Sequence, residues 1–122
     1  MNKIDLSKIK VKEIPTKTIK ANFEGVEKDY TIFELQQAQL VQLNTFRESI
    51  NDYMRVRTSV VFTLSAGLQI EFSTAEFLFD NCTLEAVRVA NLIYDFAADV
   101  QEEKVKEAEE AEKNSQTETQ NP

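Results

Sequence analysis

The stretch that decides the fold is KTIKANFEGVEKDYTI, residues 17–32. Apolar and polar side chains alternate on both sides of a short loop that contains Gly25. Because successive side chains of a strand point to opposite faces, two alternating runs around such a loop predict a β-hairpin. The apolar members of the two runs are Ile19, Ala21, Phe23, Tyr30 and Ile32.

The segment before the hairpin, LSKIKVKEI at residues 6–14, alternates in the same way. Ile9 and Val11 fall on one side, and the lysines at 8, 10 and 12 fall on the other. This pattern predicts an extended, Lys-rich arm over residues 1–15. Pro15 ends the arm, because proline has no N–H to donate to a strand ladder.

A long amphipathic helix is predicted after the hairpin, over IFELQQAQLVQLNTFRESINDYM at residues 32–54. Thr31 and Glu34 have the spacing of a capping box, in which side chains bind the free N–H groups of the first helical turn. The stretch contains no Gly or Pro, and its apolar residues recur at intervals of three and four. These residues are Phe33, Leu40, Leu43, Phe46, Ile50 and Tyr53.

Two structures remain open for VRTSVVFTLSAGLQIEF, residues 56–72. A second hairpin over residues 58–72 is favoured by the β-branched side chains and by a turn at Ser65–Gly67. The alternative is a helix that continues from Arg55 and stops at Gly67, since glycine commonly ends helices. We predict the hairpin.

Two further helices are predicted. Ser73 and Glu76 repeat the capping-box spacing, so a short helix begins at Thr74 and is interrupted at Asp80-Asn81. Thr83 caps the last helix, over LEAVRVANLIYDFAADV at residues 84–100. Beyond it the apolar stripe ends, so we expect this helix to fray between Gln101 and Asn114 and to pass into a disordered acidic tail.

The predicted fold class is therefore α+β. It consists of the arm (residues 1–15), one globular domain with a hairpin and a mainly helical remainder (16–100), and a fraying helix end with an acidic tail (101–122). The hydrophobic content of 42% is sufficient for one core but is concentrated before residue 101.

The charge distribution argues against nucleic-acid binding. Residues 1–20 contain six Lys against Asp5 and Glu13, whereas residues 101–122 contain three Lys and seven Glu, and the whole chain has a net charge of −7. Binding to phosphate requires several clustered Lys or Arg, and spread lysines on an extended segment are typical of a solvated strand face.

The composition also argues against catalysis, metals and cofactors. The chain has no His, which is the commonest general base near neutral pH and the commonest metal ligand. Cys82 is the single cysteine, and Gly25 and Gly67 are the two glycines, so neither a zinc cluster nor a Gly-rich phosphate loop can form. We expect a non-enzyme.

The expected location is the cytoplasm, without membrane contact. No apolar run approaches the roughly 18 residues of a membrane span, and the start lacks the apolar region of a secretory signal. A lone cysteine cannot form an intramolecular disulfide, which fits a reducing compartment.

The class of protein that remains is one that acts by binding other proteins. A homo-oligomer is one expected state of the chain. Phe77, Leu78 and Phe79 are consecutive and cannot all face one core from a helix, unless the short helix is buried on all sides. We expect at least one of them to meet a partner. The full set of expected contact residues is Phe33, Leu40, Phe77, Leu78, Phe79 and Tyr94.

This layout resembles that of the tail assembly chaperones of long-tailed, siphovirus-like bacteriophages. The resemblance covers residues 8–100: the Lys-rich start and hairpin KTIKANFEGVEKDYTI, the helix beginning TIFELQQAQLVQL, and the FDNCTLEAV passage into the last helix. It implies a mainly helical, often oligomeric factor that binds the tape measure protein and helps to recruit tail tube subunits around it. The possible hairpin at 58–72 departs from that layout.

Two other functions stay open at this stage. One is a structural subunit of a phage tail or of the head–tail joint, and the other is a bacterial adaptor between proteins. A chaperone would keep a long coiled-coil partner soluble, whereas a structural subunit would remain with the particles.

Overall fold

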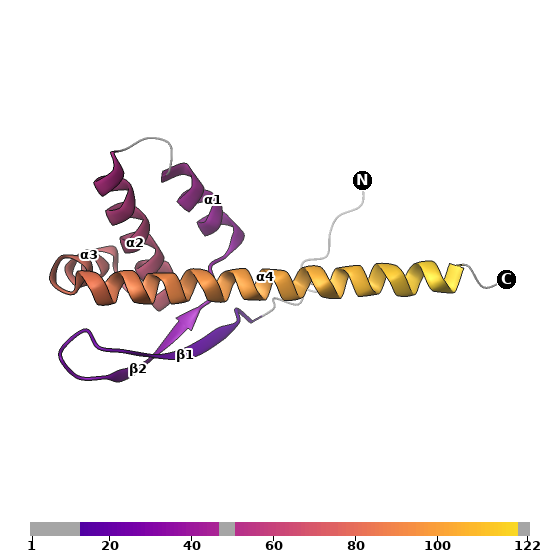
Figure 1. The fold of residues 1–122 in the computed structure, drawn as a ribbon, viewed down its shortest axis with the longest axis horizontal. Helices are drawn as coiled ribbons and strands as arrows, with labels where there is room; N and C mark the ends of the chain where they lie inside the picture. Colours follow the sequence, from indigo (N-terminus) through magenta and orange to yellow (C-terminus); the bar gives the residue numbers. More distant parts are fainter. Residues whose placement is uncertain (1–12, 47–50, 120–122) are drawn as a thin grey trace, which may run out of the picture.

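The computed structural model describes residues 13–46 and 51–119, with side chains up to Lys113. Its fold is α+β, as predicted: a two-stranded antiparallel hairpin precedes four helices (Figure 1). Most of the predicted arm, residues 1–12, lies outside the described residues. The elements are β1 (Thr16–Ala21), β2 (Lys28–Phe33), α1 (Gln37–Phe46), α2 (Asp52–Leu68), α3 (Phe72–Asn81) and α4 (Thr83–Thr119).

The predicted hairpin is confirmed. β1 pairs antiparallel with β2, with Thr18 opposite Thr31 and Ile19 opposite Tyr30. In the connecting loop Gly25 has a φ of +82°, a conformation that side chains with a Cβ rarely adopt. The alternation places the buried side chains of Ile19 and Ile32 toward the helices.

The predicted long helix over residues 32–54 is wrong in its start and its continuity. Thr31 lies inside β2 instead of capping a helix, because its alternating, β-branched surroundings complete the ladder with β1. α1 begins at Gln37, where the side-chain oxygen of Gln39 accepts the N–H of Gln36 at 2.8 Å. α2 then starts anew, because the side chain of Asn51 accepts the N–H of Met54 and satisfies its first turn.

The second hairpin predicted at residues 58–72 is also wrong, and the helical alternative holds. Residues 52–68 form α2, and the β-branched side chains of Val60, Val61 and Thr63 are buried along it. The helix ends at Leu68, and the next residue, Gln69, has a φ of 55° and donates its N–H to the carbonyl of Ser65. This left-handed residue terminates the helix as a glycine commonly does.

The last two helices begin close to the predicted positions. α3 starts at Phe72, two residues before Thr74, and Glu71 precedes it without a side-chain capping bond. It ends at Asn81, where the sequence predicts an interruption, and α4 starts at Thr83.

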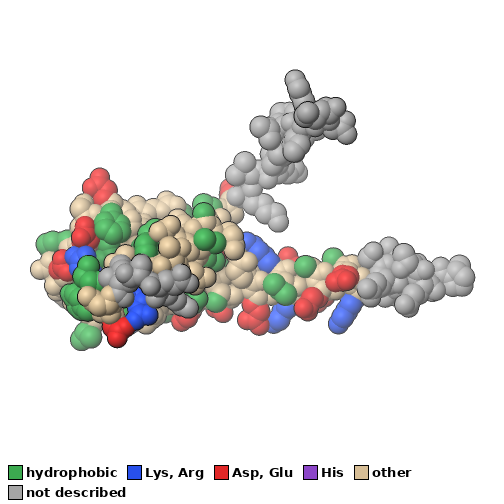
Figure 2. All heavy atoms as spheres, turned by 90° about the horizontal axis from the view of Figure 1, so that it is seen from above, with side chains coloured by type: hydrophobic (Ala, Val, Ile, Leu, Met, Phe, Trp, Pro, Cys, Tyr) green, Lys and Arg blue, Asp and Glu red, His purple; other side chains and the backbone are tan. Residues whose placement is uncertain are grey.

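α4 continues to Thr119, past the Gln101–Asn114 stretch in which the sequence predicts that it frays. Its 37 residues correspond to about 55 Å at the rise of an α-helix. The outer half projects from the body and exposes acidic and basic side chains (Figures 1 and 2). The sequence there consists mainly of strong helix formers and has no Gly or Pro within the helix. An ion pair between Nζ of Lys106 and Oε1 of Glu102, at 3.5 Å, also supports the helix.

One hydrophobic core joins the hairpin to the helices. In Figure 1 the hairpin lies below α4, while α1 and the first turns of α2 lie above it. On α4 the buried side chains end at Ala97. No helix in the described ranges is both long and apolar enough to cross a membrane. The largest fully buried side chains are Ile32, Leu35, Val61, Leu64, Val89 and Ile93.

A very close approach joins α2 to α4 at Gly67. A Cβ added at Gly67 would stand 2.5 Å from Cγ2 of Ile93 and 2.6 Å from its Cδ1, well inside contact distance. Ile93 itself is fully buried. The two helices can therefore meet here only because residue 67 lacks a side chain.

A buried carboxylate ties the hairpin to α4 at the point where the helix leaves the core. Glu34 is only 3% exposed, and its Oε1 accepts hydrogen bonds from Nε2 of Gln101 at 3.1 Å and Nζ of Lys104 at 3.2 Å. Its Oε2 is buried and has no hydrogen-bond partner among the described residues. Since a buried charge is costly unless it is paired, the contact with Lys104 is important for stability.

Replacing Gly67 by alanine tests the close approach. We expect Gly67→Ala to lower the free energy of unfolding by about 1–3 kcal/mol in urea denaturation, because the added methyl overlaps Ile93. In an Ile93→Ala background the overlap is gone, and the same change should stabilise α2 by up to about 1 kcal/mol, since alanine favours helix over glycine. An equal cost in both backgrounds would contradict this packing.

Replacing Lys104 by alanine tests the buried carboxylate. We expect Lys104→Ala to lower the free energy of unfolding by about 1–3 kcal/mol, because Glu34 loses its charged partner inside the protein. The matched control is Lys106→Ala, whose partner Glu102 is on the surface, and its expected cost is below about 0.5 kcal/mol. Similar costs for the two variants would show that Glu34 does not depend on Lys104.

Candidate protein-interaction surface

One face of α2 carries a row of residues spaced alternately by three and four. At this spacing side chains line one stripe of a helix, as the core positions of a coiled coil do. The members of this row, which we call the α2 stripe, are Tyr53, Val56, Val60, Thr63 and Gly67.

The two halves of the α2 stripe have opposite environments. The lower half is covered: Val60 and Thr63 are buried, and Gly67 meets α4. The upper half is bare, with Tyr53 65% and Val56 52% exposed. The stripe therefore continues beyond the contact with α4 that covers its lower end, which leaves a largely exposed apolar surface on the upper turns of α2.

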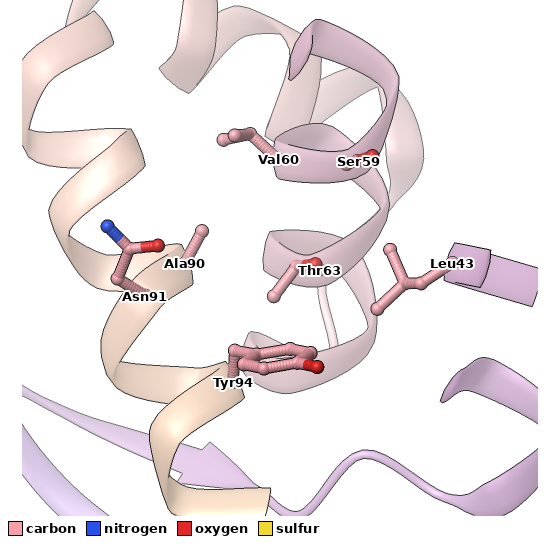
Figure 3. A pocket seen from close by; sticks show the side chains of 7 residues that line it. All are labelled: Leu43, Ser59, Val60, Thr63, Ala90, Asn91 and Tyr94. Carbon is pink, nitrogen blue, oxygen red and sulfur yellow. The ribbon is translucent and has the colours of Figure 1, made fainter. Parts of the chain in front are cut away.

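An uncharged groove lies at the junction of the two halves, between α1, α2 and α4 (Figure 3). Its volume is about 290 Å³, just below the roughly 300–1,000 Å³ of typical small-molecule sites. A space of this size suits side chains of a protein partner better than a cofactor. The lining residues are Leu43, Ser59, Val60, Thr63, Ala90, Asn91 and Tyr94.

The groove offers polar groups as well as an apolar floor. Figure 3 shows the hydroxyl of Tyr94, the amide of Asn91 and the methyl of Leu43 around the same space. Tyr94 is 46% exposed, so its ring is accessible from outside. Tyrosine combines a large apolar ring with a hydrogen-bonding hydroxyl, which makes it frequent at protein interfaces.

An ion-pair network fixes α2 against α3. Nη2 of Arg57 lies 3.3 Å from Oε2 of Glu76 and 3.1 Å from Oδ2 of Asp80, and the guanidinium is 5.9 Å from the ring centroid of Phe79. The hydrogen bond with Asp80, more than any other contact, raises the pKa of Arg57. This network sets the direction in which α2 presents its stripe.

A second network clamps α4 to the hairpin. Glu85 accepts the backbone N–H of Asn22 at 2.8 Å and a hydrogen bond from Arg88, and Arg88 also donates to the carbonyl of Lys20 at 2.8 Å. The hydrogen bond from Arg88 is the main cause that lowers the pKa of the Glu85 carboxyl. The clamp holds the first turns of α4 beside β1.

The structure does not bring the six predicted contact residues together. Tyr94 lies in the groove, while Phe33 and Leu78 line a separate cavity beside β2. Leu40 is half-buried against the core. The consecutive trio points in three directions: Phe77 is 63% exposed, Leu78 is half-buried and Phe79 is buried.

Sequence reasoning missed the upper half of the α2 stripe as a contact surface. Tyr53 belongs to the apolar face of the predicted helix over residues 32–54, and Val56 falls between this helix and the hairpin predicted at residues 58–72. The spacing from Tyr53 to Thr63 is the available signal, but it cannot show where along α2 the contact with α4 stops.

Chemistry-bearing groups are sparse in the described part of the chain. No group of three or more His, Cys, Asp or Glu side chains there is arranged to hold a metal ion. Cys82 is half-buried, and its thiol donates to the carbonyl of Phe23 at 2.9 Å. This thiol therefore helps to hold the hairpin loop against the start of α4.

No protein family, curated protein or solved structure matches this chain.

The clamp at Glu85 predicts an acid-sensitive contribution to stability. Because the folded protein lowers the pKa of Glu85 below its usual 4.5, the ionised form stabilises the fold above that pH, and this contribution is lost as the pH falls further. In urea denaturation at a series of pH values, the loss of stability below about pH 5 should be smaller in Glu85→Gln than in the wild type. Glu110→Gln, on the exposed outer half of α4, is the charge-matched control and should follow the wild type. Identical pH profiles for Glu85→Gln and the wild type would contradict the clamp.

Proposed function

We propose that this chain is a non-catalytic assembly chaperone that binds a helical segment of a long partner protein. The observation that carries the proposal is the α2 stripe, whose upper half stays bare while its lower half packs on α4. Residues at alternating intervals of three and four are matched by another amphipathic helix, since both then present one continuous apolar seam. The partner helix would lie along Tyr53 and Val56 and place a side chain in the groove at Tyr94.

The biological setting that we propose is phage tail assembly in the host cytoplasm, with the tape measure protein as the partner. The basis is the resemblance of residues 8–100 to tail assembly chaperones. The helix at Asp52–Leu68 supports it, because the second hairpin was the feature that departed from the mainly helical layout of those proteins. Recruitment of tail tube subunits belongs to the same proposal.

The outer half of α4 suits a chaperone in a different way. Residues 102–113 are exposed along the helix, and six Glu and three Lys lie among them. A dense, predominantly negative surface keeps proteins soluble by mutual repulsion. A bound, aggregation-prone partner would gain solubility from such a projection.

Co-expression with the tape measure protein tests the proposal. We expect the wild-type chain to keep the partner soluble and to elute with it in size exclusion. The double variant Tyr53→Asp/Val56→Asp should weaken binding at least tenfold, because two carboxylates would enter an apolar seam (about 1.4 kcal/mol per factor of ten).

The matched control is Val26→Asp, at an equally exposed position in the hairpin loop, which should leave binding unchanged. Circular dichroism melting of all variants excludes unfolding as the cause. If the wild-type chain neither binds the tape measure protein nor keeps it soluble, the proposal fails. Recovery of the chain with assembled particles would indicate a structural subunit instead.

A further inference from the structure

The outer edge of β2 carries backbone groups that point away from the hairpin. Glu34 donates its N–H to the carbonyl of Pro15 at 2.9 Å, so these residues form a hydrogen-bonded pair next to the ladder. In an antiparallel pair, hydrogen-bonded and non-hydrogen-bonded positions alternate. The register then directs the N–H and C=O groups of Asp29, Thr31 and Phe33 outward from β2, and those of Thr16, Thr18 and Lys20 outward from β1.

The two edges of the hairpin differ in the hydrogen bonds that their outward backbone groups receive from the rest of the protein. On the β1 edge, α4 lies alongside, and Arg88 donates to the outward carbonyl of Lys20 at 2.8 Å. On the β2 edge, no hydrogen bond from the described part of the chain reaches the outward backbone groups of Asp29, Thr31 or Phe33. The end of α2 contacts β2, but the outward backbone groups of β2 stay without hydrogen bonds among the described residues. In this sense β2 is the open edge, and an open edge is a template for another strand.

A cavity of about 450 Å³ lies along this open edge. Apolar side chains from the end of α2 and from α3 face β2 across it, among them Leu68, Ile70 and Leu78. Both charged residues among its described lining, Glu24 and Asp29, are acidic. The edge thus combines free backbone groups, an apolar wall and a negative rim.

We propose that the Lys-rich N-terminal segment of a second copy of this chain, residues 6–12, adds to β2 as a third strand. The segment alternates Ile9 and Val11 with Lys8, Lys10 and Lys12. In the added strand the apolar pair faces the helices, beside Leu68 and Ile70, and the lysines share the outer face with Asp29. This is strand addition, in which backbone bonds supply affinity and alternate side chains supply specificity.

The direction of the chain at the start of β1 favours a second copy over the chain's own arm. Pro15 still pairs with Glu34, so the chain extends past the end of β2 along the line of β1. To reach its own β2 edge, the arm would have to cross the end of the sheet and reverse direction within Glu13 and Ile14. The twelve preceding residues span up to about 40 Å when extended, which is enough to reach a neighbouring molecule.

Such an exchange is head-to-tail, because the donating arm and the accepting edge are different surfaces. Each copy can donate one arm and accept another, so the contact generates a ring if the rotation closes and a chain of copies if it does not. The proposal does not rest on the function proposed above, since the α2 stripe and the β2 edge belong to separate elements.

The hairpin supplies a matched pair of variants for the test, in the full-length chain. Thr31→Pro removes an outward N–H from the open edge, and Thr18→Pro removes the outward N–H directly opposite, on the β1 edge. Both residues are exposed and neither N–H belongs to the ladder, so neither variant removes a hydrogen bond between β1 and β2. The arm variant is Ile9→Asn/Val11→Asn, which keeps the charge.

Self-association is measured by sedimentation velocity and light scattering over a range of concentrations. We expect the wild type to exceed the 14.0 kDa of one chain as concentration rises, and Thr18→Pro to behave similarly. Thr31→Pro and the arm variant should each associate at least tenfold more weakly. Mixing these two should restore a dimer, because one still has the arm and the other still has the edge.

Three results would overturn the proposal. The first is a wild-type chain that stays monomeric up to about 1 mM, a weak affinity limit for a specific contact. The second is equal loss of association in Thr18→Pro and Thr31→Pro, and the third is full association of the arm variant. The arm variant leaves every described residue unchanged. Its result therefore tests the proposal even if a proline variant fails to fold.

Discussion

The side chain of Ile93 occupies the space that a Cβ on Gly67 would need, and the helical part of the structure depends on this contact. With α2 held so close to α4 at its lower end, the upper turns of α2 lie clear of α4 (Figure 1). The groove and the bare half of the α2 stripe are both results of that geometry. A larger residue at position 67 would move α2 outward and change both.

Glu34 joins the hairpin to α4, as the contact between Gly67 and Ile93 joins α2 to α4. Its backbone closes the hairpin through Pro15, and its carboxylate holds Lys104 and Gln101 beyond the last buried residue of the helix. One buried residue thus links the open end of the hairpin, where β1 starts and β2 ends, to the base of the projecting helix. The clamp between Glu85 and Arg88 performs the same task near the other end of the hairpin, so α4 is held at two separate points.

The parts of the fold that the sequence predicts correctly depend on local patterns. Alternation around Gly25 is sufficient for the hairpin, and the interruption at Asp80-Asn81 is visible in the chain. The stretch at 58–72 depends on distant residues: β-branched side chains fill a helix face there because α4 covers it. The exposed surface is harder to predict, because Tyr53 and Val60 share one stripe and differ only in that α2 diverges from α4 toward its first turns (Figure 1). The partners of Glu34 lie 67 and 70 residues away in the chain, so no local sequence pattern predicts these contacts.

The charge pattern of α4 has a consequence for its outer half. Like charges three or four residues apart on a helix repel one another and destabilise the helix slightly. Glu107 and Glu110, and likewise Glu109 and Glu112, have this spacing on the outer half of α4. Salt screens such repulsion between exposed charges, and a basic surface would offset it, so either would strengthen this part of the helix. The projection is thus a helix whose ordered length is sensitive to the ionic environment.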